Sequence, residues 1–79
     1  MSIADIRNAF VAAGNGKLHC TQARLRYGEA NAQILEFDGH MDDGKPFAVV
    51  SDPFPAEVNP HIKAREVAEN LLRPLAQSA

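Results

Sequence analysis

Apolar residues recur every three or four positions near the beginning of the chain, at Ile3, Ile6, Phe10 and Ala13. This spacing predicts an amphipathic helix. Ser2 precedes it as an N-cap residue, and Asp5 stands three positions later, where an acidic side chain can bond back to the cap. Gly14 follows, and we expect it to end the helix in the left-handed conformation that glycine adopts without strain.

Between Lys17 and Tyr27 the apolar residues change from even-numbered to odd-numbered positions. The first two would share one face of a strand and the later three would lie on the other: Leu18 and Cys20, then Ala23, Leu25 and Tyr27. An inserted residue near Thr21 and Gln22, a β-bulge, would return both sets to one face. The segment is therefore predicted as a bulged strand, with a second helix as the alternative.

Residues 33–51 are typical of a hairpin whose turn contains Gly44. A two-residue turn would pair Asp42 with Lys45 and divide the large apolar side chains between the two faces. A three-residue loop, with Gly44 left-handed, pairs Met41 with Lys45 instead. We predict this second register because it gathers the large apolar side chains on one face, namely Leu35, Phe37, Phe47 and Val49.

The opposite face of the predicted hairpin is mixed in character. It carries apolar and polar side chains together, namely Ile34, Ala48 and Val50 with Glu36, Asp38 and His40. Pro46 has no backbone N–H to donate, so the strand that it begins is expected at an edge of the sheet.

Residues 51–60 form a proline-rich stretch that is expected to be an extended connector. Asn59 and Pro60 then match an N-cap followed by proline at the first helical position. The helix after them is amphipathic, and its expected packing arc contains Ala64, Val67, Ala68, Leu71, Leu72 and Leu75. Pro74 is expected to end or kink this helix near Arg73.

The element order predicts one α+β domain over residues 1–79. We expect a three-stranded antiparallel sheet with two helices packed on one face, in the order helix, strand, strand, strand, helix. The chain has 79 residues, of which 19 are Ile, Leu, Val or Phe. That is a thin core, and burial of further surface by a second copy would stabilise so small a domain.

Charge and cysteine content restrict the classes of partner. The formal net charge is −2, and residues 36–57 are acidic, so binding to phosphate backbones is not expected as the main function. The single Cys allows no internal disulfide, which favours a reducing compartment. We find neither a signal-peptide pattern nor a long apolar run, and therefore expect a cytoplasmic protein without membrane contact.

The residues that could carry catalysis or bind metal show no diagnostic spacing. His19, Cys20, His40 and His61 lack a recurring ligand pattern. Two adjacent aspartates are explained by the hairpin turn, where Asp bonds to nearby backbone. No phosphate loop or nucleophile motif is present. We therefore predict no catalytic activity, no cofactor and no metal site.

Protein contact is the leading hypothesis for function. Phe54 lies between two prolines that stiffen its backbone, so it could anchor a partner at little entropic cost. The alternative is that Phe54 closes over the core as a lid. The candidate contact residues are Phe54, Val58, Ile62, Ile34 and Val50, and the expected partner is another protein or a second copy of the chain.

A second hypothesis comes from the last helix, where residues 61–68 read His-Ile-Lys-Ala-Arg-Glu-Val-Ala. With the element order, this stretch resembles the second helix of the double-stranded-RNA-binding domain family. The resemblance implies weak nucleic-acid binding through Lys63 and Arg65, and Arg24 and Arg26 are further candidates. The alternative is a solvated helix face, because phosphate binding takes several neutralising charges. A protein partner is therefore expected rather than nucleic acid.

Overall fold

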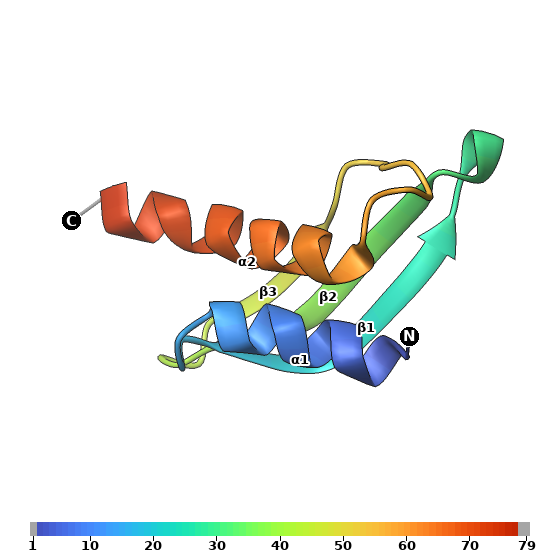
Figure 1. Ribbon diagram of the computed structural model, residues 1–79. Coiled ribbons are helices and arrows are strands. Elements are labelled where there is room, and N and C mark those ends of the chain that lie inside the picture. Colours follow the sequence, from blue (N-terminus) through green and yellow to red (C-terminus); the bar gives the residue numbers. More distant parts are fainter. Residues whose placement is uncertain (1, 78–79) are drawn as a thin grey trace.

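Two helices lie across one face of a three-stranded antiparallel sheet (Figure 1). This computed structural model describes residues 2–77, and their side chains as far as Arg73. The strands are ordered β1-β2-β3. The predicted α+β class and element order are confirmed, with α1 (Ile3–Ala13), β1 (Leu18–Tyr27), the 3-10 turn η1 (Glu29–Asn31), β2 (Gln33–Met41), β3 (Pro46–Val50) and α2 (Pro60–Gln77).

The first helix is capped as its sequence predicts. The Ser2 hydroxyl accepts from the Asp5 backbone N–H at 3.2 Å, and the Asp5 carboxylate accepts from the Ser2 N–H. The expectation of a left-handed Gly14 is wrong, because its φ is −78°. Glycine is needed at this position because a Cβ would lie only 2.8 Å from Cγ of Leu18. Positive φ instead falls on the two following residues, Asn15 and Gly16.

The predicted β-bulge lies in β1. Pairing with β2 shifts register between Cys20 and Gln22, so this segment is a strand and the helical alternative is wrong. The hydroxyl of Thr21, the inserted residue, donates to the Asp38 carbonyl at 3.1 Å. The two strands approach closely at this point, because a Cβ on Gly39 would lie 1.8 Å from the His19 carbonyl oxygen. Only glycine fits there.

The β2–β3 hairpin adopts the predicted three-residue loop. The Met41 N–H donates to the Lys45 carbonyl at 2.7 Å, and Gly44 has a φ of +93°. Phe37 then pairs with Val49. This register places on the helix-facing side the four side chains predicted to share it, of which Leu35 and Phe37 are fully buried while Phe47 and Val49 are partly buried.

The core fills the space between the sheet and the two helices. Phe10 of α1 stacks on Phe37 of β2, with ring centroids 4.1 Å apart, and Phe47 packs at the edge of this pair. The buried apolar residues are Ile6, Phe10, Leu18, Leu35, Phe37, Phe54, Ala64, Val67 and Ala68. Both helices, β1, β2 and the connector therefore contribute buried residues to one small core, and Phe47 and Val49 of β3 pack against it.

The connector between β3 and α2 is held to the sheet by Gln33. Its backbone exchanges hydrogen bonds with Phe54 at 2.7 and 2.9 Å. The buried Gln33 amide nitrogen also donates to the carbonyls of Pro55 and Val58. Phe54 is only 4 % exposed. The lid alternative is therefore correct for Phe54.

The second helix begins where its cap predicts and extends further than expected. The Asn59 side chain accepts from the His61 N–H at 2.9 Å, and Pro60 is the first helical residue. The helix continues past Pro74 to Gln77, so an end near Arg73 is wrong. Near a terminus, proline removes one backbone donor without interrupting a long series of hydrogen bonds. Leu75, expected on the packing arc, lies outside the described side chains.

Candidate functional site

The free edge of β3 offers unpaired backbone groups. Ser51 donates to Leu35 at 2.8 Å, and Met41 donates to Lys45 on the same ladder. Because hydrogen bonding alternates along an antiparallel pair, the N–H and C=O groups of Ala48 and Val50 point away from β2. No strand of the described residues 2–77 pairs with this side. The edge can therefore accept another strand.

The side chains of β3 do little to block such pairing. The strand reads Pro-Phe-Ala-Val-Val and contains no charge. Val50 is 61 % exposed, and Ala48 is exposed as well. Natural sheet edges are commonly protected by charged residues, prolines or bulges. Pro46 removes one donor at the beginning of β3, and the remainder of the edge carries no such protection.

A groove of about 330 Å³ lies beside this edge, between the end of β3 and α2. Val49, Val67 and Leu71 supply apolar walls, and polar side chains surround them. The complete lining is Val49, Val50, Ser51, Asp52, Lys63, Glu66, Val67, Asn70 and Leu71. A strand added to β3 would direct alternate side chains toward this groove. We call the β3 edge and the groove together the β3–α2 site.

Lys63 is built into the wall of the β3–α2 site. Its side chain is 14 % exposed, and Nζ lies 3.1 Å from the Glu66 carboxylate. The same ammonium stands over the ring of Phe54, 5.8 Å from its centroid. Lys63 therefore already has two partners within the molecule, and its charge is neutralised locally.

The predicted protein-contact residues do not form one surface. Ile34 and Val50 lie on the outer face of the sheet, which is the face away from the helices, whereas Ile62 is 60 % exposed on α2. Val58 is half-buried in the connector, and Phe54 is buried. Of these five residues, Val50 alone lines the β3–α2 site.

The predicted nucleic-acid residues are also separated. Arg24 and Arg26 lie on the outer face and form ion pairs with Glu36 of β2. Lys63 and Arg65 belong to α2, on the other side of the sheet. The fold therefore does not bring the four basic residues into one cluster.

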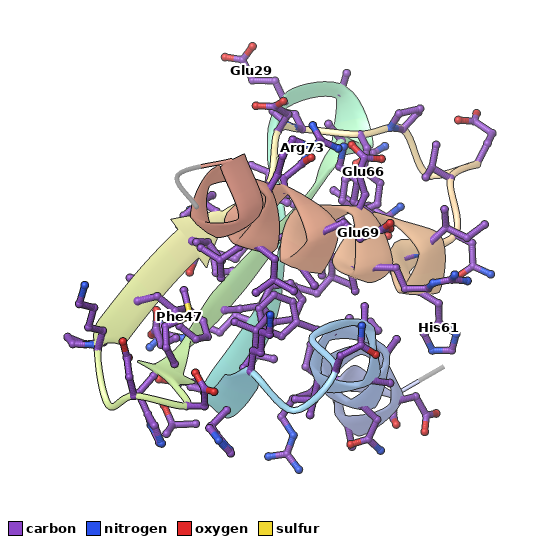
Figure 2. All side chains as sticks on the ribbon, turned by 90° about the vertical axis from the view of Figure 1, so that its left-hand side faces the viewer. Glu29, Phe47, His61, Glu66, Glu69 and Arg73 are labelled. Carbon is purple, nitrogen blue, oxygen red and sulfur yellow. The ribbon has the colours of Figure 1, made fainter. Side chains whose placement is uncertain are left out.

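Two of the three histidines meet on the outer face. His19 and His40 pair across β1 and β2 with ring centroids 5.0 Å apart. His61 lies at the beginning of α2 (Figure 2). Within the described residues, no group of three or more His, Cys, Asp or Glu side chains could hold a metal ion.

The lone cysteine lies at the bulge of β1. Burial raises the pKa of the Cys20 thiol above its ordinary value, and the thiol donates a hydrogen bond to the Gln22 carbonyl at 3.2 Å. A thiol with a raised pKa is a poor nucleophile at neutral pH. The Cys20 side chain is partly buried and packs against the core.

Sequence reasoning missed most of the groove lining. Val67 and Leu71 were expected in the core, and their contribution to a surface groove depends on how α2 lies relative to β3. One local signal for the edge was present, because the residues from Pro46 to Val50 form an uncharged run between Lys45 and Asp52.

No helix of the described chain is both long and apolar enough to cross a membrane. Comparison with known protein families, with curated proteins and with solved structures finds no match.

Proposed function

We propose that this protein is a non-catalytic protein-interaction module that binds an extended strand at the β3–α2 site. The observation that carries the proposal is the row of outward-facing backbone groups on Ala48 and Val50 beside an apolar groove. Strand addition of this kind draws affinity from main-chain hydrogen bonds and specificity from alternate side-chain pockets.

The walls of the site favour an apolar side chain on the incoming strand. The Val49, Val67 and Leu71 side chains line the groove, and burial of apolar surface against them contributes about 25 cal/mol per Å². The Lys63 charge in the wall of the groove is neutralised by Glu66. The preferred strand therefore has an apolar residue facing the groove.

The separation of the basic residues gives no support to the nucleic-acid hypothesis. Arg24 and Arg26 are paired with Glu36, and Lys63 is paired with Glu66. Contacts with several phosphates need several unneutralised cations on one surface. Strand addition is therefore the function that the geometry favours.

The test uses a displayed library of random octapeptides, selected on the wild-type chain. Selected peptides should bind Val50→Lys at least about tenfold more weakly, because a lysine on the edge opposes strand pairing. Gln22→Lys is the matched control, since it adds the same side chain to the exposed outer face of β1. Equal binding to both variants, or no selected binder, would contradict the proposal.

A further inference from the structure

We infer that the strand received at the β3–α2 site is β3 of a second copy of this chain. This inference rests on the proposed function. The two copies would pair antiparallel about a two-fold axis and join their sheets into one continuous sheet. A two-fold interface uses the same surface on both partners, so the surface must complement itself.

The charges that flank β3 provide this complementarity. Lys45 immediately precedes the strand, and Asp52 follows shortly after its end. Antiparallel pairing brings the beginning of one β3 against the end of the other, so Lys45 of each copy comes near Asp52 of its partner. Opposite charges at both ends favour this arrangement, and a parallel pair would place like charges together.

The backbone groups of β3 select one register. With Val49 on the two-fold axis, Ala48 of each copy lies opposite Val50 of the other, and both residues have an outward N–H and C=O. With Ala48 on the axis, Val50 would instead face Pro46, which has no N–H to donate. The first register pairs both backbone groups of Ala48 and of Val50, whereas the second leaves the Val50 carbonyl without a donor, so we assign Val49 to the axis.

The same register fills the groove. Val49 lies on the helix-facing side of the sheet and lines the groove beside α2. Its counterpart on the axis enters from the partner, so apolar surface is covered in both copies at once. Pairing along a five-residue edge buries less surface than a standard interface, which buries about 1,600 Å². The dimer is therefore expected to be concentration-dependent, with a Kd in the range of about 1–100 µM.

Cysteine cross-linking tests the register directly, in a Cys20→Ser background that removes the native thiol. Val49→Cys should form a covalent dimer in oxidising buffer, because residues opposite each other at a non-hydrogen-bonded position have Cα atoms about 4.5 Å apart. Val50→Cys is the matched control. In this register the two substituted positions are offset by two residues along the paired strands, which is too far for a disulfide.

Sedimentation of the wild-type chain provides a second measurement, free of cysteine substitutions. Its average mass should rise toward that of a dimer with concentration, and Val50→Lys should raise the Kd at least about tenfold. Gln22→Lys should leave the Kd unchanged. Equal cross-linking of the two cysteine variants, or a dimer that persists in Val50→Lys, would overturn the inference.

The two proposals fail in different ways. A wild-type chain that stays monomeric up to about 1 mM, well above the expected range of Kd, while a selected octapeptide still binds the β3 edge, overturns the second copy and leaves strand addition intact. A monomer that binds no octapeptide overturns both. A dimer that the selected octapeptide dissociates supports both, because one surface then serves both partners.

Discussion

The two edge strands of the sheet, β1 and β3, have similar surroundings but differ in regularity and charge. Each runs beside a helix and a shallow groove, β1 beside α1 with a groove of about 280 Å³ and β3 beside α2 with a groove of about 330 Å³. The β1 edge is broken by the bulge at Thr21 and flanked by the charged Arg24 and Arg26. The β3 edge is unbroken and uncharged.

This difference shows that hydrogen-bonding capacity alone does not make an edge a binding site. Both outer strands present free backbone groups, but a bulge disrupts the regular spacing that a new strand would need. Charged neighbours add a desolvation cost to any partner that covers them. The β1 edge is therefore less suited to strand pairing than the regular β3 edge.

The largest expected effect concerns the close approach of β1 and β2 beside the bulge. Gly39→Ala should reduce the free energy of unfolding by about 3 kcal/mol or more, because the new Cβ would collide with the His19 backbone at the bulge. Urea unfolding measures the loss. Gly28→Ala is the control, since its Cβ would only touch a flexible atom of Ile34 at 3.3 Å, and it should cost under about 1 kcal/mol. Similar losses in both variants would mean that the bulge is not tightly packed.

A smaller loss is expected at the turn that sets the register of β3. Gly44→Val should cost about 1–3 kcal/mol, because a β-branched residue is strained at a φ of +93°. Gly44→Asn should cost less, since Asn tolerates positive φ better than other residues. Both are measured by thermal or urea unfolding. Equal stability of Gly44→Val and wild type would contradict the observed loop.

Hydrogen exchange compares the two edges within one molecule. The amides of Ala48 and Val50 should exchange more slowly as protein concentration rises, by about tenfold when most of the chain is dimeric. The amides of Ala23 and Leu25, which point outward from β1 by the same alternation, should not respond. Protection that rises equally on both strands would indicate association without a preferred edge.

The smallest effect concerns the thiol at the bulge. Alkylation of Cys20 at pH 8 should be several-fold slower in the folded chain than in urea, because a raised pKa lowers the fraction of thiolate at that pH. The difference between the two alkylation rates should become smaller as the pH rises through the pKa of Cys20 in the folded chain. Mass spectrometry of the alkylated chain measures the rate. Equal rates in both states would mean that the bulge opens freely in solution.

Local patterns were sufficient to predict most of the fold. The change of apolar parity after Cys20 located the bulge, and uniting the large apolar side chains selected the loop at Gly44. Both features follow from the period-two geometry of strands, which a short stretch of sequence displays. The caps at Ser2 and Asn59 are likewise local and were located correctly.

Features that depend on how the elements pack together were not predictable in the same way. Gly14 is required by its contact with Leu18, and that contact exists only once β1 has turned back beneath α1. The groove depends on the position of α2 relative to β3, which is determined by packing of the whole core. The pairing of His19 with His40 likewise depends on the register of two strands that are separated in sequence.

The bulge at Thr21 also limits how far an assembly could grow. A sheet with two open edges can add copies at both sides and extend into a filament, because a head-to-tail contact leaves one edge free after each addition. Here the β1 edge is irregular between Cys20 and Gln22, which disrupts the spacing that a second attachment would need there. The two-fold dimer proposed above uses the β3 edges of both copies, so further growth would have to use β1, where the inserted residue interrupts the ladder.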